Sequence, residues 1–110
     1  MYTEKRLVEG SLLTNTAAIY YTVASPVLKT VIKEMTICNV DIVARTITVH
    51  IVPADGSVSD SNAEFKGIVI QAGETFIVGR TCVMEFGSTL QAFASAGSAI
   101  SFSCSGVERT

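Results

Sequence analysis

Apolar and polar residues alternate along much of the chain with a period of two. In residues 46–51 (TITVHI), isoleucine or valine alternates with threonine or histidine, and residues 100–105 (ISFSCS) repeat the pattern with serine as the polar partner. Successive side chains of a β-strand point to opposite faces, so both stretches predict strands with one buried face. The stretch 30–40 breaks this parity, which predicts either a β-bulge or burial on both faces.

Short runs rich in β-branched and aromatic residues recur along the chain, with Gly, Pro, Asn, Asp and Ser between them. We expect about eight strands, at residues 7–13, 17–23, 30–40, 45–52, 65–70, 75–78, 90–94 and 99–104. Helical periodicity is nearly absent, so no helix is available to connect parallel strands. The sequence therefore predicts an all-β fold, an antiparallel two-sheet β-sandwich of the jelly-roll type. An immunoglobulin-like sandwich is the second choice, because the chain has no Trp.

The chain has 110 residues, the length of a single domain. We divide it into an N-terminal arm, residues 1–12, and a β-sandwich domain, residues 13–110. Only 16% of the residues are charged, against about 25% in an average soluble domain. Insertion into a membrane or burial against other chains would explain this. No run reaches the ~18 apolar residues of a membrane span, so burial against partners is preferred and no membrane is expected.

The distribution of charge and the N-terminal sequence bear on the possible partners and on the site of synthesis. The net charge is −2, and the eight basic residues are scattered, with only Lys5 and Arg6 adjacent. Nucleic-acid binding needs a basic patch to neutralise phosphates, so no nucleic-acid partner is expected. No apolar run follows Lys5 and Arg6, so we expect no secretory signal and synthesis in the cytoplasm.

The three cysteines, Cys38, Cys82 and Cys104, are far apart and form no CxxC pair. A zinc site is therefore not expected. Free cysteine behaves as a small hydrophobic residue, which favours reduced thiols in the core. A disulfide remains open at this stage, since only coordinates can test its geometry.

No catalytic constellation is evident. The single histidine, His50, lies within an expected strand, and no serine occurs in a G-x-S-x-G elbow. Acidic residues fall mostly near turns, and no glycine-rich phosphate loop is present. The oxygen-rich stretch 55–62 lacks the spacing of an EF-hand and is interpreted as a polar loop. We therefore expect no enzyme activity, no metal and no cofactor.

The adjacent tyrosines Tyr20 and Tyr21 are of interest because strand alternation should turn one ring away from the core. Such a ring would pack against a neighbouring subunit, where tyrosine is enriched, or serve as a platform for a glycan. The interface is the preferred interpretation. With the arm, this gives the candidate interface residues Lys5, Arg6, Leu7, Val8, Tyr20 and Tyr21.

Five segments carry a resemblance to a known group of proteins: residues 13–23, ending in Tyr-Thr-Val; 30–39, ending in Cys-Asn; 46–53, ending in Val-Pro; 68–75, with Ala-Gly-Glu-Thr; and 100–108, ending in Ser-Gly-Val-Glu. In these motifs the chain resembles small β-sandwich virion structural proteins of tailed phages, which include capsid decoration (cement), head-fibre and tail-fibre proteins. The resemblance covers residues 13–108.

The resemblance implies a non-enzymatic subunit that forms oligomers, commonly homotrimers, on the outside of a particle. The leading hypothesis is a capsid decoration protein, assembled in the host cytoplasm, that binds the outer surface of the major capsid protein shell and stabilises it. A ligand that binds only the assembled shell stabilises it by mass action. The alternative is a head- or tail-fibre module that binds a host receptor or glycan.

Overall fold

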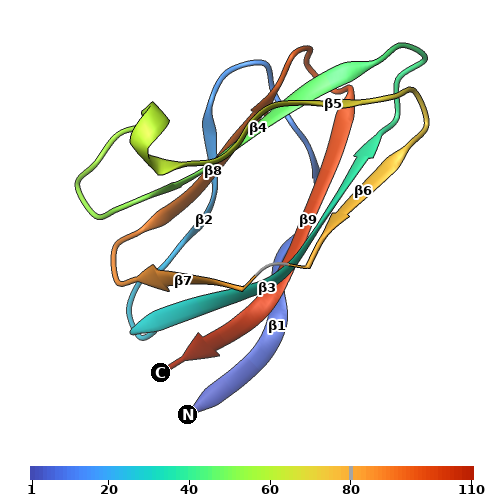
Figure 1. Ribbon diagram of the computed structural model, residues 1–110. Coiled ribbons are helices and arrows are strands. Elements are labelled where there is room, and N and C mark those ends of the chain that lie inside the picture. Colours follow the sequence, from blue (N-terminus) through green and yellow to red (C-terminus); the bar gives the residue numbers. More distant parts are fainter. Residues whose placement is uncertain (80) are drawn as a thin grey trace.

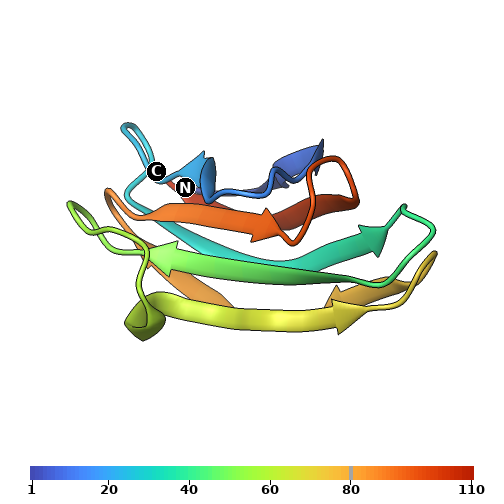
Figure 2. The ribbon, with the colours of Figure 1, turned by 90° about the horizontal axis from the view of Figure 1, so that it is seen from above.

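The strands form two antiparallel sheets that face each other, as a computed structural model of residues 1–79 and 81–110 shows (Figures 1 and 2). The first sheet contains, in spatial order, β1 (Tyr2–Leu12), β9 (Ile100–Arg109), β3 (Lys29–Asn39) and then both β6 (Thr75–Val78) and β7 (Cys82–Glu85). The second contains β2 (Ala18–Thr22), β8 (Thr89–Ala94), β4 (Arg45–Val52) and β5 (Ala63–Ile70). A single 3-10 turn, η1 (Asp60–Asn62), precedes β5.

The strand order is that of a jelly roll. Strands β6 and β7 pair with the two halves of β3, so together they occupy one strand position. The orders β1-β9-β3-β6/β7 and β2-β8-β4-β5 then give two four-position sheets linked by Greek-key connections, which define the jelly roll. The all-β, antiparallel sandwich expected from the sequence is confirmed, and the immunoglobulin-like alternative does not fit this order.

The core lies between the sheets and is built from the alternating positions of the central strands. Ile37 and Phe102 project from the first sheet, and Ile47 and Leu90 from the second; all four are at most 1% exposed. Fully burying a side chain of this size contributes about 1.5–3 kcal/mol. The apolar parity at residues 46–51 and 100–105 therefore correctly marks the inner faces.

Strand β3 contains the bulge that its broken parity predicts. The pairing of β3 with β9 shifts between Ile32 and Glu34, which leaves Lys33 as the extra residue. The bulge lets Ile32 and Met35, three positions apart, both point into the core, where each is fully buried. Without it, one of the two would face solvent.

Two segments differ from the expected strand list. Residues 82–85 form β7, which was not expected, because CVME is only four residues long. Residues 1–12 were set apart as an arm, yet residues 2–12 form β1, the edge strand beside β9. The chain ends are also paired: the Met1 amino group donates to the Thr110 carbonyl at 3.0 Å, and the Thr110 N–H donates to the Met1 carbonyl at 2.9 Å.

We expect Gly106→Ala to destabilise the fold. A Cβ at Gly106, on the inner strand β9, would lie 2.3 Å from the Val31 carbonyl oxygen and 3.0 Å from Leu7 Cδ1. Relieving such a clash shifts the backbone and costs about 1–3 kcal/mol. Thermal unfolding should show a melting temperature several degrees lower. Gly97→Ala is the control, because a Cβ there meets no atom within 4 Å; equal stability of both variants would contradict the argument.

Candidate functional site

The N-terminal candidates divide into two groups in β1. Leu7 and Val8 are 8% and 5% exposed and belong to the core, although they are adjacent. A register shift between Arg6 and Val8 makes Leu7 an extra residue, so both side chains point inward. Lys5 and Arg6 are exposed, and Lys5 Nζ lies 3.4 Å from a carboxylate oxygen of Glu108. Of these four, only Lys5 and Arg6 lie on the surface of the subunit.

Both tyrosine rings pack against the core, so the prediction that one turns away is wrong. The pairing of β2 with β8 shifts between Ile19 and Tyr21, and this bulge removes the strict alternation on which the prediction relied. Tyr20 packs edge-to-face on Phe102, with ring centroids 6.2 Å apart. Both tyrosines are partly buried against the core.

Tyr21 belongs to a polar cluster between the two sheets. Its hydroxyl donates to a Glu108 carboxylate oxygen at 2.5 Å and lies 2.7 Å from Thr30 Oγ1, which is fully buried. Burial and the bond to Glu108 raise the pKa of Tyr21 to about 12, so the hydroxyl keeps its proton. The cluster therefore connects β2, β3 and β9 and is structural.

His50 is on the polar face of β4, as expected, but it is only 6% exposed. Its Nδ1 lies 2.8 Å from Asn62 Oδ1, and its ring stacks on Phe93. The polar loop after β4 folds over this face, held by the Asn62 amide, which donates to the Ser57 carbonyl at 2.9 Å. An amide, rather than a carboxylate, is thus the partner of His50, which is not the arrangement of a catalytic triad.

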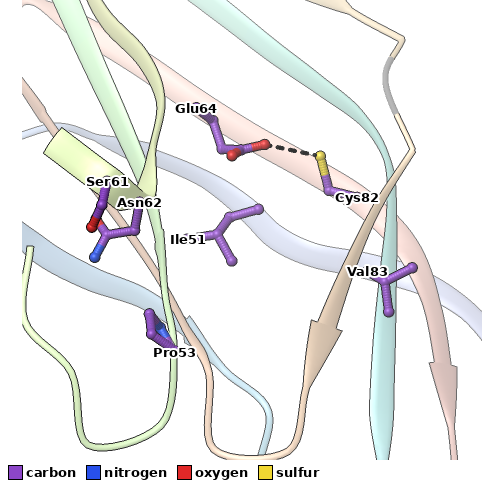
Figure 3. A pocket seen from close by; sticks show the side chains of 7 residues that line it. All are labelled: Ile51, Pro53, Ser61, Asn62, Glu64, Cys82 and Val83. Atoms are coloured by element: carbon purple, nitrogen blue, oxygen red, sulfur yellow. Dashed lines mark hydrogen bonds between the residues drawn. The ribbon is translucent and has the colours of Figure 1, made fainter. Parts of the chain in front are cut away.

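A cleft opens between the edge strands β5 and β7, on one long side of the sandwich (Figure 3). It has a volume of about 420 Å³ and is lined by Ile51, Pro53, Ser61, Asn62, Glu64, Cys82 and Val83. Cys82 Sγ donates to Glu64 Oε1 at 3.3 Å, which joins the two sheets across the cleft (Figure 3). Figure 3 shows Ser61 and Asn62 on the other side of Ile51 from this pair.

The other thiols and carboxylates of the described residues form no larger cluster of metal-ligand type. Cys38, Cys82 and Cys104 are free thiols, and burial raises the pKa of Cys104 to about 12, so this thiol stays protonated. Within residues 1–79 and 81–110, no three His, Cys, Asp or Glu side chains lie together as a metal site requires. In the same residues, no helix has the length and apolar character needed to cross a membrane.

The most exposed large apolar side chain among the described residues, Ile42, lies in a loop that the sequence analysis did not select. Between β3 and β4, Val40, Ile42 and Val43 are 55%, 90% and 46% exposed; we call these three residues the apolar loop. Their signal in the sequence is three branched apolar residues outside the alternating pattern, between two strong strands. The loop lies at the upper right of Figure 1, beside the connection from β5 to β6.

The side chain of Asn39 anchors the backbone of the apolar loop. Its buried side-chain amide donates to the carbonyl oxygens of Val43 at 2.9 Å and Ile70 at 2.8 Å. Its Oδ1 accepts a hydrogen bond from the N–H of Asp41 at 2.9 Å. The loop backbone is therefore fixed by a side chain that β3 itself positions.

Asp41 completes this network. Its Oδ1 accepts from the Ile42 N–H at 2.7 Å, and its Oδ2 accepts from Arg45 Nε and Nη2, each at 2.8 Å. These bonds, the backbone one first and the Arg45 one second, lower the pKa of Asp41. The carboxylate stays ionised at neutral pH, and its hydrogen bonds hold the backbone of the loop at Ile42.

No protein-family model matches the chain, and no curated protein matches it either. Solved structures do share its architecture. A chain from Bacillus endospore appendages, a family of disulfide-linked pili, superposes with a TM-score of 0.58 and 15% identity over 99% of this chain and 88% of that chain. The likeness is one of fold.

Two viral chains superpose in the same way. A chain of the T13 viral particle of IBDV, an icosahedral virus, gives a TM-score of 0.55 with 7% identity over 98% of this chain. A chain of the infectious bursal disease virus Gx strain gives 0.50 with 14% identity over 98%. This chain spans only 30% and 31% of the length of those two chains.

We expect Asp41→Asn to lower the melting temperature at neutral pH, because the amide loses the charged bond to Arg45. Since folding lowers the pKa of Asp41, the ionised carboxylate stabilises the native state fully above its unfolded pKa of about 3.9 and loses this effect as pH falls through the lowered folded pKa. Thermal unfolding at pH 7 and at pH 2 should show a difference from wild type that vanishes in acid.

Asp55→Asn is the control for this comparison. Asp55 is exposed, in a turn at positive φ that Asn also adopts. A difference between Asp41→Asn and wild type that persists unchanged at pH 2 would show that the carboxylate charge does not hold the loop.

Proposed function

We propose that this chain is a non-enzymatic structural protein of a virus particle, specifically a capsid decoration protein of a tailed phage that self-associates and binds the outer surface of the major capsid protein shell. The observation that carries the proposal is the apolar loop, in which Ile42 is 90% exposed on a backbone that is hydrogen-bonded to Asn39 and Asp41. An apolar side chain on an ordered loop at the end of a domain is suited to fill a pocket on another protein, because binding then requires little further ordering of the loop.

The charges around the apolar loop favour a protein partner over a lipid surface. Arg45, the cation beside the loop, is already paired with Asp41. Surfaces that bind anionic membranes instead carry clusters of free Lys and Arg. With only 16% charged residues, the chain also gains from burying part of its surface in an assembly.

The fold supports the proposal at a coarser level. The jelly roll is a common architecture of viral shells, and the fold of this chain recurs in chains of a viral particle and of an appendage. The homotrimer, the location on the virion surface and assembly in the host cytoplasm, implied by the resemblance to phage proteins, are part of the proposal. The alternative of a glycan-binding fibre module relied on a free tyrosine ring, and both rings are packed.

The proposal predicts that Ile42→Asp weakens binding to the shell while leaving the fold intact. Truncating a central, well-packed contact residue costs about 2 kcal/mol or more, so we expect affinity to fall by at least about thirtyfold. The measurement is co-sedimentation of the purified chain with shells assembled from the major capsid protein of the phage that encodes it.

Leu28→Asp is the matched control. Leu28 is 52% exposed and precedes β3, whereas the apolar loop follows β3, so the two lie at opposite ends of the sandwich. Shell binding that is unchanged in Ile42→Asp, or equally reduced in Leu28→Asp, would contradict a role of the loop. No binding of the wild-type chain to its shell would overturn the decoration function itself.

A further inference from the structure

The edges of the two sheets differ in how well they are protected. The first sheet ends in β1 on one side and in β6 and β7 on the other, and the second ends in β2 and β5. An edge strand leaves backbone N–H and C=O groups free to pair with another chain. Proteins prevent this with charges, bulges and short or twisted edges.

Strand β1 is protected by charged residues and by bulges. Four of its residues are charged: Glu4, Lys5, Arg6 and Glu9. Its pairing with β9 shifts register twice, and Gly10 lies at a φ of +111°. A second strand could not follow this edge in a regular ladder.

The edges of the second sheet are interrupted as well. Strand β2 has five residues and the bulge at Tyr20. Strand β5 has Lys66 and Glu64, two register shifts against β4 and Gly67 at a φ of +64°. Neither strand offers an uncharged, regular ladder.

Strand β6 is short, with four residues against five in β2, but it has neither a bulge nor a charged residue. Its four residues pair with β3 without a register shift, and its sequence is Thr-Phe-Ile-Val. Ile77 is 60% exposed on the outer face of the sheet, and Phe76 is 37% exposed on the inner face although it contacts Phe65, with ring centroids 6.3 Å apart. Strand β7 also pairs with β3 without a register shift and exposes Val83, but it contains Glu85. Among the described edge strands, β6 is thus the regular one without a charged residue.

We infer that β6 is a copy-to-copy interface, in which the β6 strands of two subunits pair antiparallel about a two-fold axis that passes beside Ile77. The partner is a second copy because this edge is complementary to itself. It carries no charge that would repel its own copy, and a two-fold axis brings identical patches together. Pairing also satisfies the free backbone groups of both edges at once.

The faces of the joined sheet determine the register. A two-fold axis perpendicular to the sheet keeps inner residues opposite inner residues, and an axis near the middle of β6 sets either Phe76 or Ile77 opposite its own copy. With Ile77 opposite Ile77, Phe76 lies opposite Val78, and all three apolar positions meet apolar partners. The other register sets Glu74 against Val78 and Thr75 against Ile77, which is a poorer match.

A cross-linking experiment tests this register. Directly opposite residues in an antiparallel pair have Cα atoms about 4.5–5.5 Å apart, within the range of a disulfide. We expect Ile77→Cys, in a Cys38→Ser background that removes the partly exposed native thiol, to form a disulfide-linked dimer on mild oxidation. Non-reducing electrophoresis of the purified full-length chain measures the linked fraction.

Val83→Cys in the same background is the matched control. Val83 is also an exposed apolar residue, 56% exposed, on the edge strand β7. In the inferred pairing, its two copies are about 30 Å apart, because Val83 and Ile77 pair with Val31 and Thr36, which are five residues apart along β3. Cross-linking no faster in Ile77→Cys than in Val83→Cys would overturn the inference.

A second variant removes the contact. Ile77→Lys puts a charge on the edge, as natural edge strands do, and we expect the dissociation constant to rise at least tenfold with an unchanged melting temperature of the monomer. Light scattering on a sizing column should give an even number of wild-type chains, a dimer or, with the trimer of the proposed function, a hexamer. A plain trimer or a monomer at all concentrations would overturn the interface, whereas shell binding would be unaffected by either result.

Discussion

Strand β3 is the element on which the first sheet depends. It pairs with β9 along its length and, on its other side, with β6 and then β7, so β1 is the one described strand of that sheet that it does not contact through the ladder. The bulge at Lys33 directs Ile32 and Met35 into the core together. At its end, Asn39 anchors the loop to β4 and accepts the Gly73 N–H at 3.0 Å. Strand β3 therefore positions part of the core, the apolar loop and the edge strand β6.

Period-two patterns identified the inner faces well, because burial between two sheets is the strongest constraint on those positions. They could not show what covers an outer face. Thr48 and His50 were expected on a polar face, and they lie there, yet both are only 6% exposed. The cover comes from residues distant in sequence: Gly67 N–H donates to Thr48 Oγ1 at 3.0 Å, and Asn62 contacts His50. No local pattern records such contacts.

The incorrect expectation about the tyrosines has a single cause. Alternation holds only where pairing is regular, and one inserted residue reverses the direction of each side chain that follows. In β2 the inserted residue is Tyr20, so Tyr20 and Tyr21 both point toward the core. In β1 it is Leu7, so Leu7 and Val8 both point inward. The sequence indicated a break in β3 because the apolar residues Val31, Met35 and Ile37 fall on one parity, whereas Ile32 falls on the other. In β1 and β2 the bulged residues are themselves apolar or aromatic, so nothing in the sequence revealed the break.

Two of the exposed apolar surfaces, the apolar loop and strand β6, are each fixed by hydrogen bonds to their neighbours. Hydrogen bonds to Asp41 order the apolar loop, and β6 pairs with β3 without a register shift. The two surfaces are also linked by geometry. An antiparallel pair about Ile77 reverses strand direction, so the apolar loops of the two copies would point to opposite ends of the dimer. If both contacts form, one copy binds the shell through its loop and the other projects its loop outward. A decorated shell would then carry an outward-facing apolar loop for each bound dimer, available to a further protein layer.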